Sequence, residues 1–360
     1  MMTILRKMLL AGLISILVLF TSCNSGPSSS ANESVNLLGA GSSFVNPIMT
    51  KWVANFQQTN PNFRINYQSM GSGAGIEQLK KGLVDFGASD AALSDDKLKD
   101  MPPIVQLPES AGPVCITYNL PSLKDPLKLS GTTLAGIYLG TIKKWNDAAI
   151  ARENTGVKLP NTGIIVAHRS DGSGTSNIFT TYLDAVSPEW HSKVGKGLSI
   201  NWPTGIGGKG SEGVTGVVKQ TEGGIGYVEL TYATENSLPV AQIQNKAGKW
   251  ITPSPESTSA AIAAFSKELA QDVRTSIVDP LATAPDAYPI CGLTFLMIPK
   301  QPKDQAKGQA LQKFVQYVIT SGQDISPDLH YAKLPPDLQQ LDQQLLAQVA
   351  VSGNASSSGQ

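Results

Sequence analysis

Short apolar runs alternate with helix-forming patterns along most of this chain, and no other feature restricts its fold as strongly. Strands are predicted at residues 35–38, 64–68, 84–88, 114–118, 164–167, 225–228 and 293–298. Helices are predicted from 48 to 56, 75 to 82, 178 to 186, 262 to 273 and 311 to 319, where apolar residues recur at helical spacing. Strands that alternate with helices predict an α/β architecture.

The length of the chain predicts two lobes. About 325 residues lie between the polar termini, more than a single domain usually holds. The Pro-rich stretches 101–113 and 280–289 are the expected crossing points. One lobe would therefore consist of residues 35–111 and 290–350, and the other of residues 112–289.

The N-terminus reads as an export signal. Arg6 and Lys7 precede an uncharged apolar run from 8 to 20 and then small residues, which predicts a secretory signal over 1–22. Cys23 resembles the lipidated cysteine of bacterial lipoproteins, with Phe20 where that motif usually has Leu. We expect a lipid-anchored protein in the periplasm or on the outer face of a membrane. Residues 23–34 would form a flexible tether, and the polar tail 351–360 would be disordered.

Composition excludes several classes of function. The 28 Lys and Arg residues equal the 28 Asp and Glu residues, so the chain lacks the basic excess of a nucleic-acid-binding protein. Three histidines and three cysteines offer little for a metal site, and no metal or cofactor is expected. Removal of 1–22 leaves 26 basic and 28 acidic residues, a net charge of −2. Cys115 and Cys291 then remain, either as a disulfide or as two buried thiols.

Three turns of small residues are the clearest candidates for a binding site. They are 39–44 (GAGSSF), 71–75 (GSGAG) and 171–176 (DGSGTS), each between a predicted strand and a predicted helix. Glycine lets backbone N–H groups converge, and a helix that starts there directs its free N–H groups at one point. Such turns suit an anion, although none matches the P-loop or the dinucleotide fingerprint. The glycine-rich loop 207–210 carries no specific signal.

Charged residues accompany two of these segments. Arg169 ends a predicted strand and can present two donors to an oxyanion, while Asp171 forms a salt bridge with it or holds it in position. Asp90 follows the strand at 84–88, where it is either a helix cap or a ligand. A carboxylate suits an anion site if the anion carries a proton, because it then accepts a hydrogen bond from a protonated phosphate and repels fully ionised sulfate.

The motifs together resemble those of a known family. GAGSSF, GSGAG, DFGASDA, IYLGTIKKW, HRSDGSGTS and GGIGYVE occur in this order over roughly residues 36–345. They are similar to motifs of the substrate-binding protein of the bacterial high-affinity phosphate ABC transporter. The resemblance implies a two-lobed periplasmic-binding-protein fold of type II, in which each lobe is a mixed sheet flanked by helices and the ligand lies in the cleft between them.

The resemblance also implies roles for individual residues. Phosphate would be bound by Ser43, Phe44, Ser72, Asp90, Arg169, Ser173, Gly174 and Thr175, with Asp171 as the partner of Arg169. Position 43 is often threonine in the family, and Ala74 departs from the usual small Ser or Gly. The crossing strands would lie near residues 110 and 290, so that a disulfide between Cys115 and Cys291 would clamp the hinge.

The sequence therefore predicts a monomeric binding protein rather than an enzyme. It would capture inorganic phosphate and deliver it to the permease and ATPase of an ABC importer, without contact with nucleic acid. One alternative is a secreted phosphate-ester hydrolase, which lacks a recognisable general base near Ser43, Ser72 or Ser173. Another is a binding protein for a different oxyanion such as sulfate, which Asp90 disfavours.

Overall fold

One long strand, β4 (Ile104–Tyr118), joins the two halves of the main sheet in this computed structural model, which describes residues 34–351. Residues 104–108 and 110–113 of β4 pair with β11 (Cys291–Pro299), and residues 114–118 pair with β8 (Gly224–Glu229). All 15 residues of β4 are buried. The strand therefore belongs to the core of both halves.

The main sheet is mixed and has the strand order β2-β1-β3-β11-β4-β8-β6-β7. Its other strands are β1 (Val35–Gly41), β2 (Phe63–Ser69), β3 (Phe86–Ser89), β6 (Ile165–Arg169) and β7 (Ile206–Gly208). Neighbours among β1, β2 and β3 are parallel, as are those among β6, β7 and β8, whereas β11 is antiparallel to both β3 and β4. A small second sheet contains β5 (Lys128–Leu129), β9 (Gln242–Gln244) and β10 (Trp250–Ile251).

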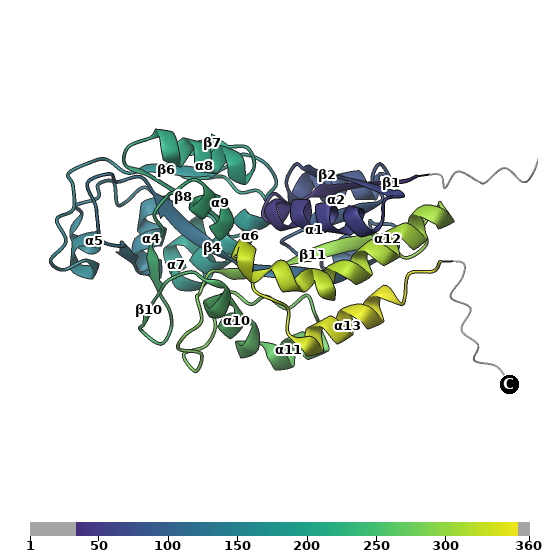
Figure 1. The fold of residues 1–360 in the computed structure, drawn as a ribbon. Helices are drawn as coiled ribbons and strands as arrows, with labels where there is room; N and C mark the ends of the chain where they lie inside the picture. Colours follow the sequence, from purple (N-terminus) through teal and green to yellow (C-terminus); the bar gives the residue numbers. More distant parts are fainter. Residues whose placement is uncertain (1–33, 352–360) are drawn as a thin grey trace, which may run out of the picture. The chain divides into compact units, whose positions relative to one another are not determined.

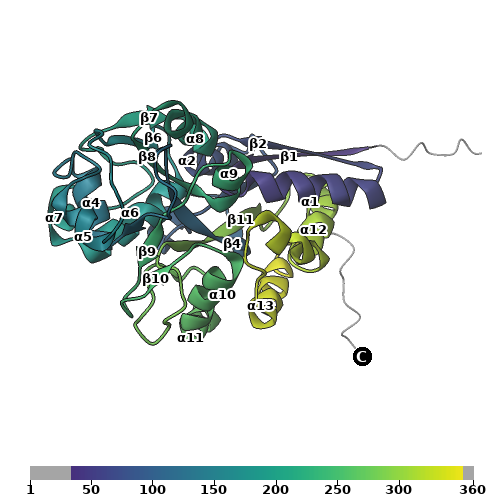
Figure 2. The ribbon, with the colours of Figure 1, turned by 60° about the vertical axis from the view of Figure 1, so that its left-hand side comes forward.

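Helices cover both halves of the sheet (Figure 1). Around β1 and β2 lie α1 (Asn46–Thr59), α2 (Ser72–Lys80) and α12 (Gln305–Val318). The other half carries α4 (Gly131–Tyr138), α5 (Ala148–Glu153), α6 (Gly174–Val186), α7 (Pro188–Lys193), α8 (Gly210–Gln220) and α9 (Leu230–Glu235). Figure 2 shows α10 (Pro255–Ala264), α11 (Ser266–Gln271) and α13 (Pro336–Leu346) together beneath β4 and β11. Short helical segments complete the chain at α3 (Asp95–Leu98), η1 (Ser321–Ile325) and η2 (Pro327–Leu329).

The structure confirms the predicted α/β class with a mixed sheet in each half, and it corrects one local prediction. The pattern from 262 to 273 predicted one helix, but α10 ends at Ala264 and α11 begins at Ser266. The break lets α11 contact α13. The Pro-rich stretch 101–113 is largely strand, because Pro108 lies beside an irregularity in the pairing and Pro113 is opposite Cys291, where the pairing with β11 ends.

Both cysteines of the described chain are free and buried, so the disulfide alternative is wrong for this structure. Cys115 joins a small apolar cluster with Val214 and Val228, while Cys291 belongs to the main core. The Cys291 thiol lies 3.3 Å from the carbonyl oxygen of Tyr288, to which it donates. The two thiols therefore serve as small core residues.

Several predictions concern residues outside 34–351: the signal 1–22, the lipidated Cys23, nearly all of the tether and the tail after 351. Within the described range, no helix combines the length and the apolar character needed to cross a bilayer.

Candidate anion-binding site

The three predicted turns come together where strands end and helices begin. Ser42 follows β1, Ser72 opens α2, and Ser173 caps α6, where its hydroxyl accepts a hydrogen bond from the N–H of Ser176. Free N–H groups at the start of a helix favour negative charge. The site is thus lined by helix starts from both halves of the sheet.

Glycine is required where these turns touch. Gly71 has φ of 90°, and a Cβ atom there would lie 2.2 Å from a carboxylate oxygen of Asp171. A Cβ atom on Gly174 would lie 2.6 Å from the Cβ atom of Asp90. Between the turns, the N–H of Gly73 donates to the carbonyl of Gly172 at 2.9 Å. The turns therefore meet backbone to backbone, at a distance that side chains would prevent.

Asp90 lies at the centre of the site and is only 4% exposed. One carboxylate oxygen accepts a short hydrogen bond from the hydroxyl of Ser42, and the other lies 3.3 Å from the hydroxyl of Thr175, which donates to it. Burial raises the pKa of Asp90 to about 6, although the Ser42 hydrogen bond and the charge of Arg169 oppose the rise. The carboxylate is poised to accept another hydrogen bond.

Arg169 supplies the positive charge. It is 3% exposed, and its Nε and Nη2 atoms donate to the two oxygens of Asp171 at 2.8 and 2.5 Å. Its Nη1 atom donates to the hydroxyl of Thr175 at 3.4 Å. Burial lowers the pKa of Arg169, but Asp171 outweighs that effect and keeps it above its usual value. For Asp171 burial acts in the opposite direction and raises the pKa, but the hydrogen bonds from Arg169 keep the pKa of this carboxyl below its usual range.

Further hydrogen bonds join the N-terminal turns to the middle of the chain. The hydroxyl of Ser72 accepts from the N–H of Asp90 at 3.3 Å and from the N–H of Gly174 at 3.1 Å. The hydroxyls of Ser43 and Ser211 lie 2.9 Å apart. Residues more than 80 positions apart in sequence thus form one buried polar cluster.

The structure brings the sequence-predicted residues together and shows which protein groups they contact. Phe44 turns its ring into the core against Tyr331, so only its backbone faces the cluster, where its N–H donates to the hydroxyl of Ser42. Ser43 bonds to Ser211 rather than to Asp90. The hydroxyl of Ser173 is engaged as the cap of α6.

Sequence reasoning missed two contributors. Ser42 provides the hydroxyl that reaches Asp90, and the segment at Gly210 and Ser211 forms a fourth turn of the same kind. The N–H of Gly210 donates to Asp171 at 3.0 Å. The signal was present, because the glycine-rich segment 207–210 runs from the end of β7 into the start of α8, just as the other turns join a strand to a helix.

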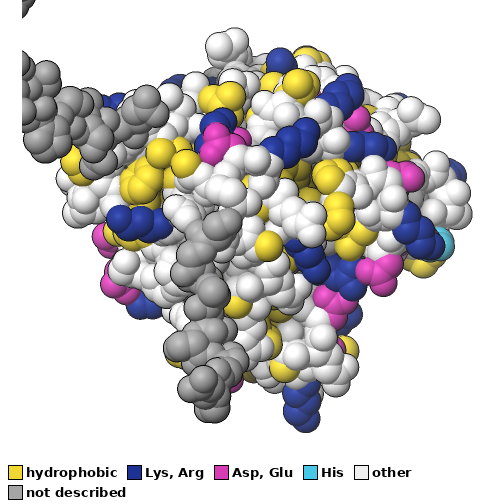
Figure 3. Space-filling view, turned by 90° about the vertical axis from the view of Figure 1, so that its right-hand side faces the viewer, with side chains coloured by type: hydrophobic (Ala, Val, Ile, Leu, Met, Phe, Trp, Pro, Cys, Tyr) yellow, Lys and Arg dark blue, Asp and Glu magenta, His cyan; other side chains and the backbone are white. Residues whose placement is uncertain are grey.

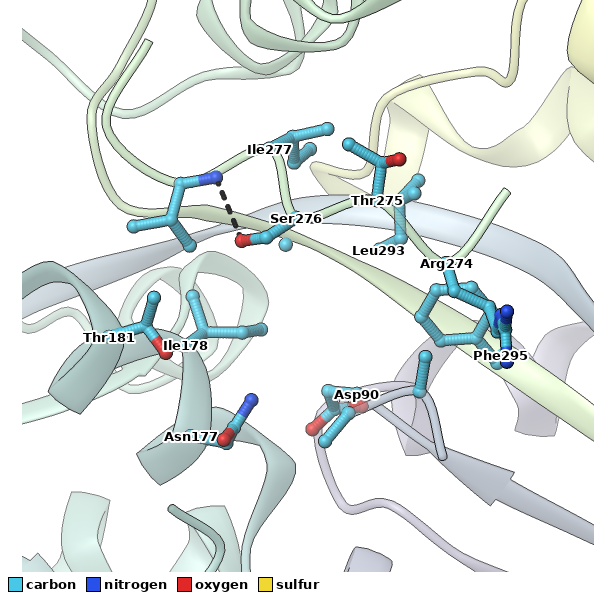
Figure 4. A pocket seen from close by; sticks show the side chains of 14 residues that line it. Asp90, Asn177, Ile178, Thr181, Arg274, Thr275, Ser276, Ile277, Leu293 and Phe295 are labelled. Atoms are coloured by element: carbon cyan, nitrogen blue, oxygen red, sulfur yellow. Dashed lines mark hydrogen bonds between the residues drawn. The ribbon is translucent and has the colours of Figure 1, made fainter. Parts of the chain in front are cut away.

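A cavity of about 140 Å³ begins at Asp90. Figure 4 shows Asp90 and Asn177 on one side of it, and Thr275 and Ser276 on the other. Arg274 lies at its edge, where its side chain donates to Asp95 and Asp272. Asp90 is the one lining residue that also belongs to the predicted site.

Two observations on the described residues concern metal ions and surface charge. Residues 34–351 hold no group of three or more His, Cys, Asp or Glu side chains that could bind a metal ion. On the face drawn in Figure 3, Lys and Arg side chains are interspersed with Asp and Glu. Charges of both signs are mixed on that face, so it offers an anion little long-range attraction.

Comparison with known proteins gives a consistent result. The family model described as a PBP superfamily domain matches residues 26–321. The chain is 44% identical to the "Phosphate-binding protein PstS" of Xylella fastidiosa strain Temecula1, over 87% of this chain and 85% of the relative.

Solved structures share the fold at lower identity. A high-affinity periplasmic phosphate-binding protein, solved with phosphate at pH 8.5, aligns over 86% of this chain and 93% of its own, with a TM-score of 0.70 and 20% identity. An ABC-type phosphate transport receptor from Vibrio cholerae aligns over 83% and 100%, with a TM-score of 0.52 and 17% identity. These likenesses confirm the predicted type II fold.

Burial of Asp90 predicts a pH-dependent loss of stability in the ligand-free protein. Its pKa of about 6 exceeds the ordinary 3.8, so the folded state binds the proton more tightly than the unfolded state. Stability should fall as pH rises from about 4 to about 6, by about 3 kcal/mol. Urea unfolding measures the free energy of unfolding of the wild type and of Asp90→Asn. The value for the wild type minus that for the variant should decrease by about 3 kcal/mol between about pH 4 and about pH 6. Parallel profiles for the two proteins would contradict the assignment.

Proposed function

Since the chain belongs to the PstS family of phosphate-binding proteins, within the PBP superfamily, we propose that it captures inorganic phosphate and delivers it to an ABC import permease. The observation that carries the proposal is the placement of Asp90. A buried carboxylate lies among neutral donors, linked through Thr175 to Arg169. Phosphate is an oxyanion that keeps a proton near neutral pH, and only such an anion can use an acceptor there.

Capture would rely on short-range contacts. Arg169 offers its guanidinium edge, already fixed by Asp171, so little side-chain freedom is lost on binding. The further ligands would be the hydroxyls or N–H groups of Ser43, Phe44, Ser72, Ser173, Gly174 and Thr175. Hydrogen bonds that involve a charge gain strength in a buried site, because water does not compete there.

Discrimination would come from the proton. Asp90 accepts a hydrogen bond from the P–OH group of phosphate, whereas sulfate would place an acceptor against the carboxylate. An unmatched buried acceptor costs more than a made hydrogen bond gains. The same group therefore favours one tetrahedral anion and disfavours the other.

Release would require the two lobes to separate. We propose that residues 35–111 and 290–350 form one lobe and residues 112–289 the other, with β4 and β11 between them. The contacts from Ser72 to Gly174 and from Ser43 to Ser211 would then cross the cleft and break when it opens. The closed form would be the one that the permease recognises.

We propose binding without catalysis. In the described chain, Ser42 bonds to Asp90 and Ser43 to Ser211, and no histidine is a hydrogen-bond partner of either hydroxyl. Serine nucleophiles are commonly activated by an adjacent histidine, and the one carboxylate that contacts Ser42, Asp90, is assigned here to the proton of phosphate. An assay with a chromogenic phosphate ester tests this directly, and turnover would favour the hydrolase alternative.

The setting of this activity is part of the proposal. The protein would be a monomer, held by lipid on Cys23 at the periplasmic or outer face of the membrane. Its partners would be phosphate and the permease and ATPase of the importer.

Arg169→Met should weaken phosphate binding by at least about 1.5–3 kcal/mol, the range of a charged hydrogen bond, which is roughly 10- to 100-fold in Kd. Calorimetric titration of the purified protein measures it. Arg64→Met, on an exposed position of β2, is the matched control and should bind as the wild type does. Equal affinities for the two variants would exclude Arg169 as a ligand.

Asp90→Asn should admit sulfate. An amide can donate a hydrogen bond to a fully ionised oxyanion, whereas the carboxylate cannot. Competition titrations should show sulfate displacing phosphate from this variant and not from the wild type. Asp96→Asn, at an exposed site, serves as the control. If Asp90→Asn still ignores sulfate, Asp90 does not set the selectivity.

A further inference from the structure

Glu109 is a buried carboxyl that the proposed phosphate contacts do not use. It lies on β4 and is completely buried. Across the ladder, Ser110 faces Thr294 and Pro108 faces Phe295, so that Glu109 is an extra residue with no partner on β11. Such a β-bulge redirects a side chain, and bulges are frequent beside functional sites.

The contacts of Glu109 fix its position. The hydroxyl of Thr294 lies 3.2 Å from its Oε1 atom, while its Oε2 atom has no hydrogen-bond partner among the described residues. The side-chain amide of Gln323, from η1, donates to its backbone carbonyl at 2.8 Å. Gln323 therefore fixes the backbone of the bulge, and Thr294 fixes the carboxyl of Glu109.

Thr294 also connects Glu109 to the anion site. Phe295 pairs with Ser89 in the antiparallel register of β11 and β3, so Thr294 and Asp90, the next residue on each strand, lie opposite each other. A hydrogen bond from the Thr294 side chain lowers the pKa of Asp90, which opposes the effect of burial. Burial raises the pKa of Glu109 to about 8, the Thr294 hydrogen bond opposes this, and the negative charge of Asp90 adds to it. The titratable groups that interact with Glu109 are Asp90 at the end of β3 and Tyr67 on β2. The contacts from β11 and η1, Thr294 and Gln323, are uncharged.

We propose that Glu109 acts through Thr294 as a positioning residue for the proton acceptor Asp90, and that phosphate affinity falls when Glu109 ionises. The inference rests on the proposed function, since it concerns the same site. It adds a third carboxyl to the control of binding, next to Asp90 and Asp171.

The effect of Glu109 on Asp90 depends on the single proton of the Thr294 hydroxyl. A threonine hydroxyl has a single proton to donate. While Glu109 is protonated, its O–H donates to Thr294, and Thr294 donates to Asp90. When Glu109 ionises, Thr294 turns its proton to Glu109, Asp90 loses a donor, and a second negative charge appears beside the anion. Affinity is therefore present below the pKa of Glu109 and is lost above it.

The test compares the phosphate Kd of the wild type and of Glu109→Gln by calorimetry from about pH 6 to about pH 10. Taking the ratio of the two values at each pH cancels the ionisation of phosphate itself. Above about pH 8 the Kd of the wild type should rise relative to the variant, by up to about tenfold per pH unit. A ratio that does not change with pH overturns the role of Glu109. Absence of phosphate binding at every pH overturns the proposed function as well.

Glu229 offers a matched control. It is also completely buried, its pKa is likewise raised to about 8 by burial, and its Oε1 atom has no hydrogen-bond partner. Its other oxygen accepts from the N–H of Thr231, away from Asp90. Glu229→Gln should lose phosphate affinity at alkaline pH as the wild type does. If it removes that loss, the effect is not specific to Glu109 and the inference fails.

Variants of Thr294 separate positioning from folding. Thr294→Val keeps the carboxyl of Glu109 but removes the hydroxyl between Glu109 and Asp90, so it should reduce the loss of phosphate affinity at alkaline pH. Thr294→Ser returns the hydroxyl and should restore that loss. Infrared difference spectra between neutral and alkaline pH provide an independent readout. In the wild type, the carbonyl band of a protonated carboxylic acid should disappear as the pH is raised. The spectra of Glu109→Gln should not show this change. Identical spectra would show that Glu109 does not hold the proton.

Discussion

The ion pair between Arg169 and Asp171 is the interaction on which the site depends. Both side chains lie inside the polar cluster, and the guanidinium donates to both carboxylate oxygens. With Asp90 ionised, these three groups carry a net charge of −1 before any anion arrives. Attraction by excess positive charge therefore cannot explain binding. In the proposed function, affinity comes instead from directed donors and from a proton shared between phosphate and Asp90.

Close backbone contact makes that arrangement possible. Gly73 and Gly172 meet without side chains between them, and Gly174 packs directly against Asp90. Donors from segments far apart in sequence can then converge on a volume as small as an oxyanion. The glycines of the turns therefore allow the close backbone approach that forms the site, in addition to shaping the loops.

Much of this arrangement could be predicted from sequence because it is local. A strand, a small-residue turn and a helix start leave a readable pattern, and Asp90 and Arg169 stand at the ends of two such strands. What could not be predicted depends on contacts between distant segments. The pairing of Ser43 with Ser211, the role of Ser42 and the bulge at Glu109 are set by the register and approach of segments that the sequence does not place.

The most direct test is to purify the protein under native conditions, remove free phosphate, unfold the protein and measure the phosphate released. The account predicts close to one phosphate per chain, because a buried site with directed donors releases its ligand slowly. A chain that carries none, and that takes up none when phosphate is added back, would contradict it.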